Sequence, residues 1–248
     1  MSHIFNHRSY GDVSRRFPCW FIRGNREDYQ IEHAEGKSPY WCQSSSSGSL
    51  LYTYDHLTIE DLVWIRSWPI CDQIQIGDMP TFTICHGSPN STKELLYWNS
   101  EQALKALQTI EDSLLICGHT HNQGEMLWEQ HCLANPGSVG MPENQDGSGE
   151  YMILYGDNGE WKREYRSFTY DIKTCIEMYQ KSDLMEYSFY FPYVVMEQIR
   201  TGYNALKAVT ERIKELTKEE MNQVEPWEIP ERYWQQACEE IIKIGVER

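Results

Sequence analysis

Four side chains of metal-ligand type follow short apolar runs in this sequence, each within three residues of a glycine. They are Asn25, His86, His119 and His121. Imidazole nitrogens and amide oxygens suit Mn, Fe, Zn and Ni, and no soft set of cysteine thiolates competes with them. His119 and His121 alone would most simply be two surface histidines. Their company elsewhere in the chain favours a metal site instead.

The apolar runs predict the strands that position these ligands. Residues 114–117 are a short apolar run that ends at Gly118, as a buried strand does. Histidines at i and i+2 of an extended stretch point to the same side, so His119 and His121 can serve one metal or two adjacent ones. Strands are also predicted over residues 81–85, before His86, and over residues 19–22, before Asn25. Ligands gather at strand ends in layered α/β proteins, because loops converge there over a rigid sheet.

The other patterns predict a mixed α/β core followed by helices. Thr58 is a candidate N-cap for a helix that Pro69 ends. The domain boundaries expected are 1–16 for a loose N-terminal segment, 17–170 for the core and 171–248 for a C-terminal helical extension. The remaining predictions are a short helix after Asn25, a loop over 40–49, a strand at 74–76, a helix over 100–110, hairpins over 125–134 and 151–168, and helices over 172–182, 188–216 with a break near Thr201, and 229–245.

Composition excludes several partners. The 248 residues carry a formal charge of −15 and show no basic run, which argues against a nucleic-acid-binding patch. The eight cysteines are scattered without a Cys-x-x-Cys pair, which indicates reduced thiols and a cytoplasmic protein. No signal peptide and no apolar run of membrane-spanning length is present, so we expect no membrane partner.

Four motifs together resemble the calcineurin-like metallophosphoesterases, and most closely the small bacterial YfcE-like phosphodiesterases. They are Gly24-Asn25, His86-Gly87-Ser88-Pro89, Gly118-His119-Thr120-His121 and Asn135-Pro136-Gly137-Ser138-Val139-Gly140. The resemblance covers residues 17–170. It implies a two-sheet α/β sandwich flanked by helices. It also implies metal-dependent hydrolysis of a small phosphorylated substrate, with a phosphate diester favoured over a monoester.

The resemblance also implies roles for single residues. Asn25, His86 and His119 would bind one metal ion and His121 a second, with manganese the first choice and Fe, Zn or Ni the others. Two such ions clamp the phosphate and activate a hydroxide. Asn25, Arg26 and His86 are therefore the candidate catalytic residues.

Other positions of the motifs would contact the substrate. Arg26 would hold a phosphate oxygen by a bidentate contact, or else pair with Glu27 or Asp28. Gly87 and Ser88 are the further candidate substrate-binding residues. Gly137 and Ser138 would shape a turn beside the site and help to fix the histidine loop.

The chain departs from the family at its start. The family's Asp-x-His and Gly-Asp motifs, which supply the second metal's ligands and the bridging carboxylate, have no clear counterpart. Asp12, His3 and His7 are weak substitutes, better interpreted as solvated residues of a loose terminus. The expectation is an N-terminally truncated member whose exposed sheet edge is covered by another chain, as in a homo-oligomer.

Two alternatives to the dinuclear enzyme stay open. One is a non-catalytic remnant that binds one metal or a partner chain. The other, with the least support, is a single-metal hydrolase that uses only Asn25, His86 and His119.

The remaining candidate residues are better interpreted as structural than as functional. His33, His56 and His131 lack a motif, and Cys85 and Cys117 belong to core strands rather than acting as nucleophiles. The serine run 44–47 before Gly48 favours an ordinary loop over a phosphate loop. The aromatic segment 187–193 could line a substrate cleft, but helix packing or a dimer contact is favoured. The charges of residues 207–219 indicate a solvated helix face.

Overall fold

The computed structural model describes residues 16–38, 40–217 and 229–244. Its centre is a mixed sheet of five strands in the order β1-β2-β3-β5-β4. Strands β2, β3 and β5 run parallel, while β1 and β4 pair antiparallel at the two edges. The bounds are β1 Cys71–Ile74, β2 Phe82–Cys85, β3 Leu114–Ile116, β4 Gly124–Trp128 and β5 His131–Asn135.

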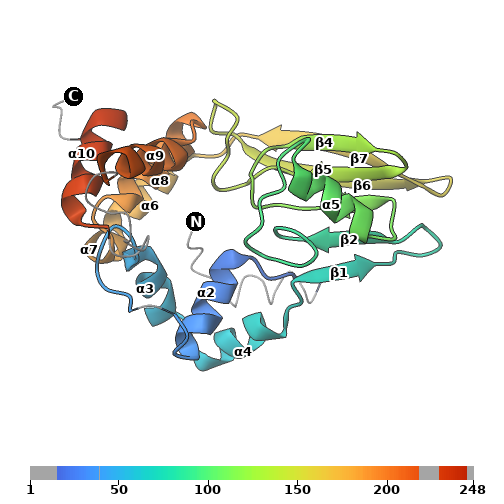
Figure 1. Ribbon diagram of the computed structural model, residues 1–248, viewed down its shortest axis with the longest axis horizontal. Coiled ribbons are helices and arrows are strands. Elements are labelled where there is room, and N and C mark those ends of the chain that lie inside the picture. Colours follow the sequence, from blue (N-terminus) through green and yellow to red (C-terminus); the bar gives the residue numbers. More distant parts are fainter. Residues whose placement is uncertain (1–15, 39, 218–228, 245–248) are drawn as a thin grey trace.

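Each face of this sheet is covered by a different element (Figure 1). Helix α5 (Glu101–Thr109) buries Ala103, Ala106 and Leu107 against Leu115 and Leu133. The hairpin of β6 (Gly149–Asp157) and β7 (Glu160–Phe168) forms a second sheet, and its apolar side chains pack against a separate cluster on the opposite face. The predicted two-sheet α/β architecture is confirmed.

The N-terminal helices lie at the lower left of Figure 1, between the sheet and the C-terminal helices. They are α2 (Asn25–Ala34), α3 (Gly48–Asp55) and α4 (Ile59–Ser67). The predicted cap of α4 is confirmed, because the Thr58 hydroxyl accepts a hydrogen bond from the Asp61 amide at 3.1 Å. Helix α3 was not predicted, since its first residues fall in the stretch expected to be a loop.

The strand predicted over residues 19–22 is wrong. This segment has no regular structure, and both Cys19 and Trp20 are exposed. A strand requires a hydrogen-bonded neighbour, and the first ladder-like bond of this stretch comes only at Arg23, whose amide donates to the Pro69 carbonyl at 2.9 Å. An apolar run is therefore insufficient to make a strand where no partner strand lies beside it.

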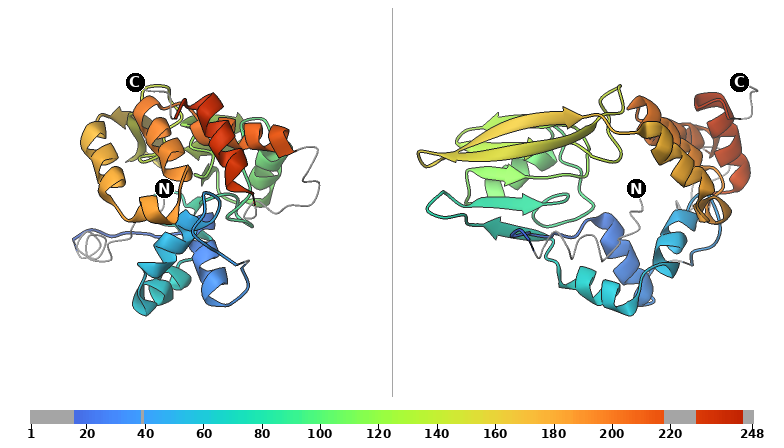
Figure 2. Two further views of the ribbon diagram at one scale, coloured as in Figure 1. Left: turned by 90° about the vertical axis from the view of Figure 1, so that its left-hand side faces the viewer. Right: turned by 180° about the vertical axis from the view of Figure 1, so that it is seen from behind.

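The C-terminal helices form a unit with a hydrophobic cluster of its own at one end of the molecule (Figure 2). Their bounds are α6 Ile172–Lys181, α7 Leu184–Tyr187, α8 Phe191–Thr201, α9 Ala205–Thr217 and α10 Glu231–Ile241. The predicted break near Thr201 is confirmed: Gly202 ends α8 in the left-handed conformation, with φ of 65°. None of the helices described is both long and apolar enough to cross a membrane.

The serine run before α3 binds a carboxylate of the protein itself. The backbone amide of Ser45 donates to Glu231 of α10 at 2.7 Å, and its hydroxyl donates to the same carboxylate at 2.6 Å. Ser46 accepts from the indole of Trp234 at 2.9 Å. The loop therefore fastens the C-terminal helices to the N-terminal ones. The predicted loop is confirmed, and its anion-binding groups are already occupied.

The residues set aside as packing residues do pack. His33 stacks on Trp41 with ring centroids 4.0 Å apart, and His131 hydrogen-bonds to the Asp112 carbonyl at 3.0 Å. All eight cysteines are free, in line with the prediction of reduced thiols. Burial raises the pKa of the Cys85 thiol and raises that of Cys117 to about 12, so neither is a thiolate nucleophile at neutral pH.

Candidate metal centre and its pocket

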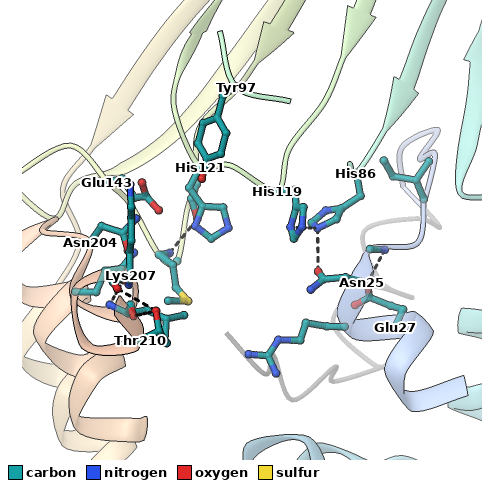
Figure 3. A pocket seen from close by; sticks show the side chains of 18 of the residues that line it. Asn25, Glu27, His86, Tyr97, His119, His121, Glu143, Asn204, Lys207 and Thr210 are labelled. Carbon is teal, nitrogen blue, oxygen red and sulfur yellow. Dashed lines mark hydrogen bonds between the residues drawn. The ribbon is translucent and has the colours of Figure 1, made fainter. Parts of the chain in front are cut away.

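Three of the predicted ligands converge on one point. The Nε2 atom of His86 lies 3.1 Å from Oδ1 of Asn25 and 3.1 Å from Nδ1 of His119 (Figure 3). Two ligand atoms that bind one metal ion at about 2.1 Å and at a right angle are about 3 Å apart. The spacing of the three atoms therefore fits a shared divalent cation.

The fold brings these ligands together from three elements. His86 and His119 follow β2 and β3, which are parallel, so both emerge at the same edge of the sheet. The Gly118 amide donates to the His86 carbonyl at 2.8 Å and ties the two loops together. Asn25 begins α2, and Gly24 just before it is packed on His86, where a Cβ atom would lie 3.0 Å from the imidazole ring. A larger residue at Gly24 would push Asn25 away.

Burial keeps the imidazoles neutral. Desolvation lowers the pKa of His86 to about 3, with the neighbouring His119 and His121 adding to the effect, and it lowers the pKa of His119 as well. The His119 ring also hydrogen-bonds to the backbone carbonyl of Lys93, the kind of contact that orients metal-bound histidines. Neutral imidazole is the form that binds metal, so the environment suits that role.

Asn135 holds the histidine loop in place. Its side chain is fully buried and donates to the Gly118 carbonyl and to the Thr120 hydroxyl, each at 2.9 Å. Its Oδ1 atom accepts the Gly137 amide at 2.9 Å. This role was predicted for Gly137 and Ser138 and not for Asn135. The signal was present, since an asparagine at the end of a buried strand must satisfy its amide locally.

His121 does not point the way that the sequence predicted. His119 and His121 have φ values of 61° and 56°, so neither has the extended backbone that would align their side chains. Figure 3 shows His121 apart from His86 and His119, on the side of Glu143. Burial lowers the pKa of His121 to about 4, and its ring hydrogen-bonds to the backbone carbonyl of Met141. Within the described part of the chain, no cluster of three or more His, Cys, Asp or Glu side chains could hold a metal. Among the described residues, Asn25 is therefore the candidate third ligand beside His86 and His119.

The three candidate ligands line a cavity of about 650 Å³. Arg26 and His121 line it, while their predicted roles in phosphate and metal binding stay predictions. The guanidinium of Arg26 lies 5.7 Å from the ring centre of Phe191 and makes no hydrogen bond or ion pair with the described residues. Desolvation lowers its pKa, yet an arginine side chain stays charged at neutral pH. Since none of the described carboxylates forms an ion pair with it, the Arg26 guanidinium can offer its donors to a phosphate in this cavity.

The C-terminal helices form the opposite wall of the cavity, which the sequence analysis did not foresee. Lys207 is exposed, as predicted for a solvated helix face, and it also lines the cavity together with Asn204, Leu206 and Thr210. Arg212 does fit the predicted charged face, since it pairs with Glu215 at 3.0 Å and with Glu240 at 2.6 Å. Lys218 and Glu219 lie outside the described residues. Nothing in the helical pattern distinguishes a side that faces a cavity from one that faces bulk water.

Gly87 and Ser88 do not reach the cavity. Both are buried, and a Cβ atom on Gly87 would lie 2.5 Å from the Ser91 carbonyl oxygen. Ser88 is 2% exposed, and its amide donates to Ser91 at 2.8 Å. Their place in this tight turn gives them a packing role, and their contact with substrate stays a prediction.

Comparison with known proteins gives a family and a fold. The profile of the calcineurin-like phosphoesterase superfamily domain matches residues 4–159. No curated protein matches the sequence. A hypothetical protein from Pyrococcus horikoshii is 16% identical over 79% of this chain and 78% of its own, with a TM-score of 0.63. A metallophosphoesterase from Sphaerobacter thermophilus is 21% identical over 73% of this chain and 76% of its own, with a TM-score of 0.54. At these identities the structural likeness shows the fold alone.

Proposed function

This chain belongs to the calcineurin-like phosphoesterase superfamily, and from that premise we propose that it is a metal-dependent hydrolase of phosphate diesters. The observation that carries the proposal is the convergence of Asn25, His86 and His119. Oδ1 of Asn25 and Nδ1 of His119 each lie 3.1 Å from Nε2 of His86. Membership of the YfcE-like branch, the cytoplasmic location and manganese as the metal belong to the same proposal.

The residues would act as follows. Asn25, His86 and His119 hold a divalent cation, with His121 available to a second. When bound, the metal polarises the phosphate and activates water for attack on phosphorus. Arg26 binds a phosphate oxygen from the helix α2 side and keeps the ester oriented. Apolar side chains such as Trp68 and Tyr97 also line the cavity and limit its water.

The test is metal binding measured beside turnover. Isothermal titration of the full chain with Mn²⁺ should give at least one site, and bis-p-nitrophenyl phosphate should be hydrolysed only with metal present. His86→Ala and His119→Ala should weaken Mn²⁺ binding by at least tenfold and abolish turnover. The matched control is His56→Gln, whose ring bonds only to the Tyr52 carbonyl at 2.7 Å and packs on aromatic neighbours, and it should leave both readings unchanged.

The non-catalytic alternative has a different signature. It predicts one Mn²⁺ per chain, lost in His86→Ala, with no turnover of any diester or monoester. Its support is that the described ligand set contains two histidines and one amide but no carboxylate. Failure of Mn²⁺ and Zn²⁺ alike to bind the wild-type chain would contradict both functions.

A further inference from the structure

A second polar group lies across the cavity from the candidate metal ligands. Glu143 lies in the loop between β5 and β6, Asn204 comes just before α9, and Lys207 lies in the first turn of α9. Figure 3 shows these three side chains on one side, His86 and Asn25 on the other, and His121 between. A ligand held at the histidines must therefore extend toward α9 to fill the cavity.

The hydrogen bonds among Glu143, Asn204 and Lys207 leave some of their donor and acceptor atoms free to bind a ligand. Asn204 Oδ1 accepts the Lys207 amide at 2.9 Å, which fixes the side-chain amide so that its NH₂ faces Glu143, to which it is hydrogen-bonded. A carboxylate can accept about four hydrogen bonds, so most of the Glu143 acceptor sites stay open. The Lys207 ammonium makes no ion pair with a described residue and offers donors beside them.

The charges of this wall favour a neutral ligand group over a second anionic one. Glu143 and Lys207 together contribute no net charge, and a second phosphate here would meet the Glu143 carboxylate. A neutral group that both donates and accepts hydrogen bonds fits better: its hydroxyls donate to Glu143 and accept from Lys207. Thr210, whose hydroxyl donates to the Leu206 carbonyl at 2.8 Å, has acceptor capacity left on the same wall.

We propose that Glu143, Asn204 and Lys207 form a subsite for vicinal hydroxyls, so that the substrate is a phosphate ester of a polyol or sugar such as ribose. This inference rests on the proposed function for the position of the phosphate, beside Arg26 and the histidines. The ester spans the cavity, with its phosphate at the sheet edge and its hydroxylated part against α9. The C-terminal helices thereby select the substrate, while the sheet edge carries the ligands of the metal.

The test compares ligands that differ only in their hydroxyls. Binding to the full chain with Mn²⁺ is measured by calorimetry for AMP against 2′,3′-dideoxy-AMP, and for glycerol 3-phosphate against propyl phosphate. We expect at least a tenfold preference for the hydroxylated member of a pair. Glu143→Gln and Asn204→Ala should reduce that preference to less than threefold.

Matched variants on the exposed side of α9 control for damage to the helix. Glu211→Gln and Lys214→Met lie on the same helix but do not line the cavity, and they should keep the full preference. Equal binding within both ligand pairs, absence of binding by all four ligands, or a preference that survives Glu143→Gln would overturn the inference. Failure of the proposed function looks different: the hydroxyl preference would persist while bis-p-nitrophenyl phosphate stays intact.

Discussion

Asn135 is the single side chain on which the position of the histidine loop most depends. Asn135→Ala would leave the buried Thr120 hydroxyl without its donor, and it would also remove one hydrogen bond each from the half-buried Gly118 carbonyl and Gly137 amide. We expect the free energy of unfolding to fall by about 2 kcal/mol, because unsatisfied buried polar groups cost about 1–3 kcal/mol each when they cannot reach water. Urea unfolding measures this loss.

The same variant separates positioning from stability. Because His119 lies in the loop that Asn135 holds, Mn²⁺ affinity should also fall in Asn135→Ala, by about tenfold at a temperature where the variant is fully folded. Thr120→Val removes only one of the three bonds and should show a smaller loss of both quantities. Unchanged Mn²⁺ affinity in folded Asn135→Ala would show that the loop keeps its shape without this side chain.

Arg26 tests whether the cavity binds phosphate by geometry or by charge alone. Arg26→Lys keeps the charge but loses the planar pair of donors, so KM for a phosphate diester should rise about tenfold while kcat changes less. Lys105→Met is the control, since Lys105 is exposed on α5, pairs with Glu101 at 2.7 Å and does not line the cavity. A KM for Arg26→Lys equal to that of the wild type would remove the bidentate contact from the proposal.

At the scale of single residues, the sequence predicted which side chains would form the site better than how they would point. His86 and His119 meet because the parallel strands β2 and β3 end at one edge of the sheet, and Asn25 joins them from the start of α2. His121 escaped prediction because its backbone has positive φ, and no pattern of residue types specifies that conformation for a histidine. Local dihedral angles are decided by contacts such as those of Asn135.

Asp112 joins three elements of the sheet before β3 begins. It is 7% exposed and accepts hydrogen bonds from Thr83 at 2.6 Å, from Gln73 at 3.1 Å, and from Thr81. Burial alone would raise the pKa of Asp112, but these hydrogen bonds outweigh it and hold the pKa below its ordinary value. The ionised carboxylate therefore stabilises the fold.

The sign of its pH dependence follows from this lowered pKa. The stabilisation is complete above the pKa of the unfolded chain, about 3.9, and is lost as the pH falls below that value toward the folded pKa. Asp112→Asn should lower the free energy of unfolding by about 1–3 kcal/mol at pH 7. The difference between wild type and variant should be constant from pH 5 to pH 8 and shrink below pH 4. Urea unfolding across this range measures it, and a difference that grows on acidification would contradict the assignment.

Elements were predictable where one local signal decided them. Thr58 with Asp61 defines the start of α4, and the Asn158-Gly159 pair, with φ of 50° and 80°, makes the β6–β7 turn. The structure of residues 19–22 was not predictable in this way. A strand requires a partner strand, and four apolar residues do not indicate whether a partner lies beside them. Helix α3 was not predicted because the serines and Gly48 at its start are typical of loops. Gly48 allows close packing there, since a Cβ atom would lie 1.8 Å from the Tyr187 carbonyl oxygen.

The whole molecule combines three apolar clusters, one in the C-terminal helices and two against the sheet. The C-terminal helices pack on one cluster around Val194, Val209 and Ala237, while the sheet packs on two others. The contacts between α10 and the serine loop are hydrogen bonds to Ser45 and Ser46. The sequence indicated the change of character after residue 171, but not that the helices would return to line the cavity, because such an interface carries no periodic signal.

This division predicts two levels of stability within one chain. Glu231→Ala removes both bonds to Ser45 and should speed amide hydrogen exchange in α10 by about tenfold, while exchange in β2, β3 and β5 stays unchanged. Glu239→Ala, on the exposed side of the same helix, should leave both regions as they are. Hydrogen exchange followed by mass spectrometry measures the two regions in one experiment. Equal acceleration in the strands would mean that the cores open together as one cooperative unit. Acceleration confined to the helices would mean that the wall of the cavity can loosen while the metal ligands keep their places.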